Sequence, residues 1–221
     1  MLGYLIIVTA TLAAAIWFGI VWRPASRVLV ESGSVRATKL LAPLALALTA
    51  LVTLLLATRM GPPATKLALI TVGIWSAGTM TQTVVDASTR RLPLRISHLT
   101  AIALAGMAIL DAPSRTPSII AGALAVTAVT LVLARLTRGS LGRGDVHFSP
   151  LLGLMIGWSS PWLHLPAALI TMWLITTVSA ALVTLAGMAL RRLDRGSTIP
   201  YGPFMALGTV IAVATTLGAT P

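Results

Sequence analysis

Two aspartates, Asp86 and Asp145, are the residues of this sequence whose surroundings indicate chemistry. The chain has only five acidic residues, and these two adjoin long apolar runs, in VVDASTRRLP and in GRGDVHFSPLLGLMIG. A carboxylate beside hydrocarbon is costly, so such residues are usually functional and have a partner nearby. Each of the two aspartates is therefore the candidate partner of the other. Asp111 and Asp194 are expected to be solvated loop residues, and nothing marks Glu31.

A pair of neighbouring carboxyl groups can carry out acid–base chemistry. Two carboxyl groups in contact cannot both be ionised. One therefore keeps its proton, while the ionised one accepts a proton from water. The ionised member activates water and the protonated member polarises a carbonyl group, and together they hydrolyse a peptide bond. The alternative is that each aspartate only caps a helix or pairs with a loop arginine. Capping suits Asp145, at a predicted helix start, but not Asp86, at a helix end where the dipole disfavours an anion.

Glycine and proline residues restrict or relax the backbone around the two aspartates. Gly142 and Gly144 remove side chains next to Asp145, which lets substrate or another backbone segment approach closely. A proline at the first position of a helix costs no hydrogen bond, because that N–H has no partner within the helix. Four further residues restrict the chain where helices are predicted to begin: Pro93, Pro200, Gly202 and Pro203. Taken singly, each of these features is more typical of an ordinary loop or a rigid helix start than of a functional site.

Metal, thiol and serine chemistry are not predicted. The chain has no cysteine and only three histidines, and it contains no HExxH motif and no Gly-x-Ser-x-Gly turn. His147 follows Asp145 by two residues and is expected to be a polar residue at the membrane boundary. His98 and His164 are expected on opposite sides of the membrane. We therefore expect no metal ion and no cofactor.

The composition predicts a helical membrane protein. Of the 221 residues, 57% are hydrophobic and 10% are charged, and apolar runs long enough to cross a bilayer recur along the chain. The short alternating strands of a membrane β-barrel are missing from the sequence. The loop at 23–39 has room only for a short surface helix, so no soluble domain is expected. We predict an all-α polytopic protein with about eight transmembrane helices, at residues 2–22, 40–58, 67–85, 93–110, 118–136, 146–160, 163–190 and 202–219.

The positive charges predict how these helices are oriented. The net charge is +11, but the basic residues lie in short loops and not on a patch that would fit nucleic acid. With the N-terminus outside, only Arg59, Lys66 and Arg115 face the outer side. The other thirteen basic residues then face the cytoplasm: Arg23, Arg27, Arg36, Lys39, Arg90, Arg91, Arg95, Arg135, Arg138, Arg143, Arg191, Arg192 and Arg195. This asymmetry places both candidate aspartates on the cytoplasmic side of the membrane.

Three segments, in this order, resemble the motifs of type IV prepilin peptidases. DASTRRLP (86–93) is similar to the first motif, an Asp followed at fixed spacing by Ile or Leu and Pro. GRGDVHFSPLLGLMIG (142–157) looks like the second motif, GxGD and a glycine-containing helix. IPYGPFMALG (199–208) is similar to the closing motif, which enters the last helix.

The resemblance implies a membrane-embedded aspartyl peptidase in which Asp86 and Asp145 are the catalytic pair. It implies one peptidase domain over 1–221, with the motif-bearing part at 80–210. The substrates would be prepilins or pseudopilins of a type IV pilus or secretion system, cut at the cytoplasmic face of the inner (plasma) membrane. The remaining motif residues would support the site: Pro93, Gly142, Gly144, Pro200, Gly202 and Pro203.

The sequence departs from the family pattern in three places. Family members often have lysine where His147 stands, and Asn or Asp after the first-motif proline, where this chain has Leu94. Many also methylate the new N-terminus with an enlarged, cysteine-containing loop after the first helix, which is missing here, so methyl transfer is not expected. Two alternatives stay open: a presenilin-like protease that shares GxGD, although its Tyr-Asp and Pro-Ala-Leu motifs are missing, and a transporter or scaffold that couples the two acids to protons. The second alternative requires further polar residues deep inside the helices.

Overall fold

The computed structural model describes residues 2–31, 35–60, 64–137, 141–190 and 199–218. Within these ranges the chain forms helices and no strands, so the all-α prediction is confirmed. Two short 3-10 helices, η1 and η2, precede α5 and α7. The elements are α1 (Leu2–Glu31), α2 (Val35–Met60), α3 (Lys66–Thr89), α4 (Leu94–Asp111), η1 (Pro113–Arg115), α5 (Thr116–Leu136), α6 (Arg143–Ser159), η2 (Trp162–His164), α7 (Leu165–Ala189) and α8 (Gly202–Leu217).

Six helical segments are long and apolar enough to cross a membrane, which confirms the polytopic class. They correspond to α1–α5 and to α7 with its preceding turn. The remaining two helices, α6 and α8, have 17 and 16 residues. At about 1.5 Å per residue they are several ångströms shorter than a hydrocarbon core of about 30 Å. The number of eight membrane crossings therefore stays a prediction.

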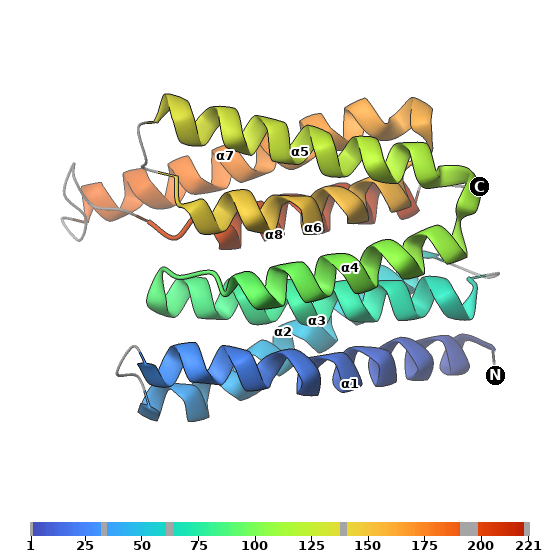
Figure 1. The fold of residues 1–221 in the computed structure, drawn as a ribbon, viewed down its shortest axis with the longest axis horizontal. Helices are drawn as coiled ribbons and strands as arrows, with labels where there is room; N and C mark the ends of the chain where they lie inside the picture. Colours follow the sequence, from blue (N-terminus) through green and yellow to red (C-terminus); the bar gives the residue numbers. More distant parts are fainter. Residues whose placement is uncertain (1, 32–34, 61–63, 138–140, 191–198, 219–221) are drawn as a thin grey trace.

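The helices lie roughly side by side along the longest axis of the molecule (Figure 1). The turn between α3 and α4 and the start of α6 lie at one end, whereas the start of α1 and the end of α8 lie at the other. Helix α3 is the central element, because it packs against α1, α2, α4 and α8, and most of its residues between Ala68 and Asp86 are buried. The arrangement brings the C-terminal end of α3 and the N-terminal ends of α4, α6 and α8 together.

Small residues allow the closest helix contacts in the bundle. A Cβ added to Gly153 on α6 would lie 2.3 Å from the carbonyl oxygen of Gly122 on α5, and one added to Gly157 would lie 2.2 Å from that of Ser118. The Ser118 hydroxyl also donates a hydrogen bond to the Gly157 carbonyl (2.9 Å). Membrane helices commonly pack in this way, because glycines let two backbones approach. The contact fixes α6, the helix that carries Asp145, against α5.

Helix α1 is longer than the sequence predicted. The segment from residue 23 to Glu31 was expected to be a loop, but α1 continues through Pro24 to Glu31. A proline inside a helix removes one backbone hydrogen bond, so other contacts must stabilise this part. A buried cluster provides them where α1 meets α3 and α4, and it consists of Val21, Ala25, Leu29, Val85 and Ile96. The extension therefore supports the end of α3 that carries Asp86.

Candidate active site

Asp86 lies in the last turn of α3, where its carboxylate meets the start of α8. The side chain is only 5% exposed, and its Oδ2 accepts a hydrogen bond from the backbone N–H of Gly202 (3.1 Å). The positive end of the α8 dipole thus offsets the unfavourable position of an anion at the end of α3. A Cβ at residue 202 would lie 2.8 Å from the same oxygen. The close contact therefore depends on glycine at this position.

The turn after Asp86 has an unusual backbone conformation. Arg90 ends α3 with φ 55° and ψ 30°, in the left-handed region, and its N–H donates to the Asp86 carbonyl oxygen (2.8 Å). Glycine normally takes this position, because the left-handed conformation costs other residues roughly 1–2 kcal/mol. Pro93 is the N-cap of α4, which begins at Leu94. The sequence predicted Pro93 as the first residue of this helix, so the two starts differ by one residue. The sequence carried no signal for the strained arginine.

Asp145 is the third residue of α6 and caps that helix. Its Oδ2 accepts a hydrogen bond from the backbone N–H of Gly142 (3.0 Å), so the capping alternative correctly describes one of its oxygens. The side chain is 6% exposed, and its Oδ1 is buried without a hydrogen-bond partner. A buried polar atom without a partner is costly. Oδ1 is therefore available for a proton, a water molecule or a substrate.

The two aspartates line the same pocket, as their predicted partnership requires. The pocket has a volume of about 400 Å³. Asp86 and Asp145 are also the only charged side chains that are buried in the described part of the chain. Gly144 allows the wall to close, because a Cβ there would lie 2.8 Å from Cβ of Leu92. The other residues that line the pocket are Arg90, Arg91, Leu92, Leu94, Gly142, Arg143 and Gly144.

The surroundings favour a protonated Asp145. Burial and then the negative charge of Asp86 raise the pKa of the Asp145 carboxyl, and the hydrogen bond from Gly142 lowers it. Tyr201, which precedes α8, also adjoins this region. Burial raises the pKa of its hydroxyl, a hydrogen bond with Thr177 lowers it, and the charge of Asp145 raises it. The charge of Asp86 therefore acts on the Asp145 carboxyl across the pocket that both residues line.

The residues of the closing motif lie at and before the start of α8, beside Asp86, and do not line the pocket. Gly202 contacts Asp86 directly, as described above. Pro203 occupies the first turn of α8, where its missing N–H removes no helical bond. Pro200 lies in the short non-helical segment before that turn, and Pro93 has the corresponding position before α4. These prolines therefore shape the backbone that leads to the site.

Two histidines meet near the candidate site, which the sequence did not indicate. Nε2 of His98 on α4 lies 3.4 Å from Nδ1 of His147 on α6, and both side chains are exposed. The place of His147 at the membrane boundary stays a prediction, and its contact with His98 was missed. The two residues are far apart in sequence and form no motif. The only available signal was that both follow predicted helix starts on the same side of the membrane.

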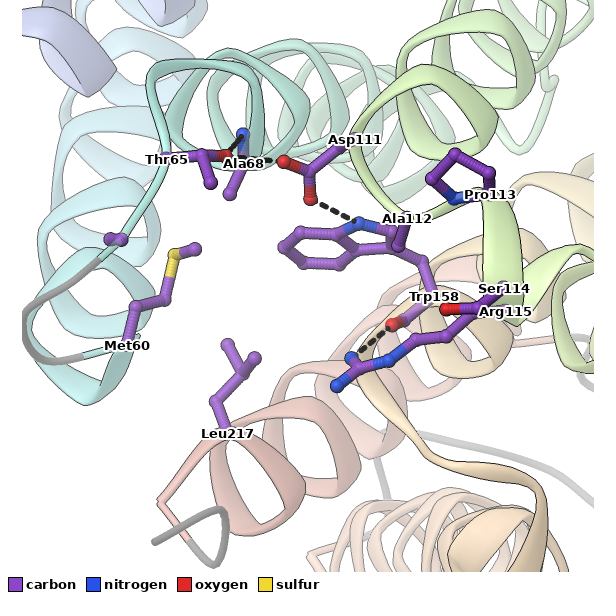
Figure 2. Close-up of a pocket in the computed structure, with 11 residues that line it drawn as sticks. Met60, Thr65, Ala68, Asp111, Ala112, Pro113, Ser114, Arg115, Trp158 and Leu217 are labelled. Atoms are coloured by element: carbon purple, nitrogen blue, oxygen red, sulfur yellow. Dashed lines mark hydrogen bonds between the residues drawn. The ribbon is translucent and has the colours of Figure 1, made fainter.

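Asp111 has a structural role at the opposite end of the bundle, so its expected place as a solvated loop residue was wrong. It accepts hydrogen bonds from the Thr65 hydroxyl and from Nε1 of Trp158, the latter at 3.0 Å (Figure 2). Nη1 of Arg115 donates to the Trp158 carbonyl oxygen (2.9 Å). These contacts join the ends of α3, α4 and α6 around a pocket of about 370 Å³. Asp194 lies outside the described residues.

The sequence of this chain matches the model of one known protein family. The model of the type IV leader peptidase family matches residues 74–190, which is just over half of the 221-residue chain. The matched region contains both Asp86 and Asp145 and ends before the closing motif. No match was found among curated proteins or among solved structures. By its family match, this chain belongs to the type IV leader peptidase family.

Proposed function

We propose that this protein is a membrane-embedded aspartyl endopeptidase that removes the leader peptides of prepilin-like or pseudopilin substrates at the cytoplasmic face of the plasma membrane. The observation that carries the proposal is the pocket in which Asp86 and Asp145, both buried, meet at one end of a membrane bundle. Membership of the leader peptidase family supports the same reaction.

The different environments of the two carboxyl groups support different roles in hydrolysis. Both carboxylates accept a backbone N–H, but only Asp145 has a buried oxygen without a partner, so Asp86 is the acid that would be ionised and act as the base. Asp145 would hold the proton on its unpartnered Oδ1, because burial and the charge of Asp86 disfavour its ionisation. Asp86 takes a proton from water as the water oxygen attacks the peptide carbonyl carbon, and Asp145 gives its proton to the carbonyl oxygen. As the tetrahedral diol collapses, the C–N bond breaks and the proton on Asp86 passes to the leaving nitrogen. One hydroxyl of the diol returns its proton to Asp145 as the carbonyl group re-forms, which regenerates the starting pair.

The orientation of the bundle supports cleavage on the cytoplasmic side. Arg90, Arg91 and Arg143 line the candidate pocket, and positively charged loops are typically retained in the cytoplasm. The apolar segment of a prepilin would lie in the bilayer while its leader reaches the pocket from the cytoplasm. Leu92 and Leu94 provide apolar surface beside the aspartates for such a chain.

The alternative of a proton-coupled transporter receives little support. Proton transfer across a bundle needs a series of ionisable groups along the path. Among the described residues, Asp86 and Asp145 are the only buried charged side chains, and both line one pocket. Methyl transfer is not part of the proposal, because only residues 32–34 separate α1 from α2.

The proposal is tested by incubating the purified full-length protein with a prepilin-like substrate and mapping the new N-terminus by mass spectrometry. Asp86→Asn and Asp145→Asn should each abolish cleavage, and the double variant should be no worse, because the two groups act as one unit. Asn is nearly isosteric with Asp, so both variants should accumulate normally.

Glu31→Gln is the matched control, because it removes an exposed acid at the end of α1. It should cleave at the wild-type rate. Near-normal cleavage by either active-site variant at wild-type protein levels would exclude the aspartyl mechanism. Loss of cleavage that accompanies loss of the protein would instead support a capping role for these residues.

A further inference from the structure

The contact between His98 and His147 places two ring nitrogens at a separation that a single metal ion can bridge. Each histidine is in the second turn of its helix, α4 or α6. The ring nitrogens that face each other, Nε2 of His98 and Nδ1 of His147, are 3.4 Å apart. The rings meet edge to face, with centroids 5.4 Å apart. Both side chains are exposed, so an ion can reach them without opening the bundle.

We propose that His98 and His147 form a two-ligand site for a divalent transition-metal ion of the zinc, nickel and copper class, which cross-links α4 and α6. Imidazole nitrogens bind these ions at about 2.0–2.1 Å. Two such nitrogens around a tetrahedral ion lie roughly 3.3 Å apart, close to the separation in this structure. A metal ion at this position would replace the proton that the two rings share.

The site is an open one. No group of three or more His, Cys, Asp or Glu side chains gathers within the described residues. Water or an external ligand would therefore complete the coordination. Arg95 and Arg143 precede the two histidines by one helical turn on the same helices, and their positive charges oppose cation binding. The site should thus be weaker than a closed four-ligand site, and Cu²⁺, which binds nitrogen ligands most tightly in the divalent series, is the best probe.

The two helices that the ion would join both lead to the candidate pocket. Asp145 precedes His147 by two residues on α6. Helix α4 follows the connection after α3, and the last helical turn of α3 carries Asp86. An ion bound to both histidines would therefore fix the spacing of the helix starts on either side of the pocket. This inference does not depend on the proposed peptidase activity, because it concerns binding alone.

The test uses the purified full-length protein in detergent micelles, without a polyhistidine tag, titrated with CuCl₂ and followed by electron paramagnetic resonance. The chain has no cysteine, so no thiolate competes for copper. We expect one Cu²⁺ per chain, with hyperfine coupling to two imidazole nitrogens. His98→Gln and His147→Gln should each lower the affinity at least about tenfold and remove one coupled nitrogen. Both positions are exposed, so both variants should fold.

His164→Gln is the matched control, because His164 lies in η2, outside the helix starts that carry the pair. It should bind copper like the wild type. Ni²⁺ should raise the unfolding temperature of the wild type and of His164→Gln, but not of His98→Gln or His147→Gln, since an ion that binds only the folded state stabilises it. The proposal is overturned if no copper binds, or if the spectrum and affinity are unchanged in the His98 and His147 variants.

Discussion

At the scale of single residues, the two acids are held in similar ways but in different environments. In each, one carboxylate oxygen accepts a backbone N–H at a helix start, from Gly202 for Asp86 and from Gly142 for Asp145. The second oxygen of Asp145 is buried without a partner. This difference is the physical basis for assigning the base to one acid and the proton to the other.

The proton on Asp145 should make stability depend on pH. A carboxyl whose pKa is raised in the folded state contributes stability below its unfolded-state pKa, and this contribution is lost as the pH rises through the folded-state pKa. Burial and then the charge of Asp86 raise the pKa of Asp145 from 3.8 to about 7, so the unfolding temperature of the wild type in micelles should fall by a few degrees between about pH 4 and about pH 7. The side chain in Asp145→Asn cannot ionise, and its amide oxygen can still accept the Gly142 N–H. The unfolding temperature of this variant should therefore depend less on pH.

Scanning the unfolding temperature against pH in both proteins checks this expectation. Glu31→Gln, which changes an exposed acid, should follow the wild-type profile. A wild-type protein that becomes more stable as the pH rises over this range would show that Asp145 is ionised throughout.

Gly202 offers a second test at the residue scale. A Cβ there would lie 2.8 Å from Oδ2 of Asp86 and 3.4 Å from its Cγ, so Gly202→Ala should displace the carboxylate. A misplacement of about 1 Å in a catalytic group commonly costs about 100-fold in rate, and we expect a loss of cleavage of that order. Cleavage kinetics with a prepilin-like substrate measure it.

The matched control for Gly202→Ala is Gly106→Ala, because nothing lies within 4 Å of a Cβ at Gly106. This variant should keep full activity and gain stability of up to about 1 kcal/mol, since alanine is the better helix former. Wild-type kinetics for Gly202→Ala would contradict a precise role for the contact between α8 and Asp86.

At the scale of helices, three separate elements bring the site together. Helix α3 supplies Asp86, α6 supplies Asp145, and the start of α8 supplies the N–H that holds Asp86. The position of α6 depends on its glycine contact with α5, where backbone meets backbone. A change far from the pocket can therefore act on the site through this packing.

Gly153→Ala tests the packing of α6 on α5. The added Cβ would lie 2.3 Å from the Gly122 carbonyl oxygen and 2.7 Å from Cα of Ala123, both backbone atoms that move only with the helix. Overpacking of this kind typically destabilises by about 1–3 kcal/mol, despite the better helix propensity of alanine. Thermal unfolding in micelles should show the loss, with Gly106→Ala changing stability in the opposite direction. An increase in stability for Gly153→Ala would show that the two helices are less closely packed than the structure has them.

At the scale of the whole molecule, the bundle has two different ends. One end contains Asp86, Asp145, Arg90, Arg91 and Arg143 around the candidate pocket. At the other end, Asp111, Thr65, Trp158 and Arg115 form the network that joins α3, α4 and α6 (Figure 2). The positive charges favour the first end as the cytoplasmic one.

Single-cysteine labelling tests this orientation, and it suits a chain that has no cysteine of its own. Ser88 is exposed in the last turn of α3, and Ser114 is exposed in η1. The C-terminal end of α3 and the connection between α4 and α5 lie at opposite ends of the bundle (Figure 1). A membrane-impermeant maleimide added to intact cells should label Ser114→Cys but not Ser88→Cys, which should react only after the membrane is permeabilised. Labelling of Ser88→Cys from outside would invert the orientation and place the candidate pocket on the outer face.

Much of this protein could be read from local properties of its sequence. The fold class and most helix bounds follow from the apolar runs, because a helix in a bilayer must be apolar over its own length. The candidate acids stood out because charge is scarce beside such runs. The early end expected for α1, at residue 22, was wrong because the cluster of Val21, Ala25 and Leu29 with α3 and α4 stabilises the helix beyond Pro24.

The remaining features depend on how the helices pack against each other. No local pattern in the sequence encodes these features, because each arises only when separate parts of the chain pack together. They are the hydrogen bond from Gly202 to Asp86, the unpartnered oxygen of Asp145, the left-handed conformation of Arg90, the hydrogen-bond network of Asp111 and the contact of His98 with His147. Hydropathy shows that a helix is in the membrane but not which of its sides faces which neighbour. That choice depends on where small residues let two backbones approach, as at Gly153 and Gly157, and it exists only once the whole bundle has formed.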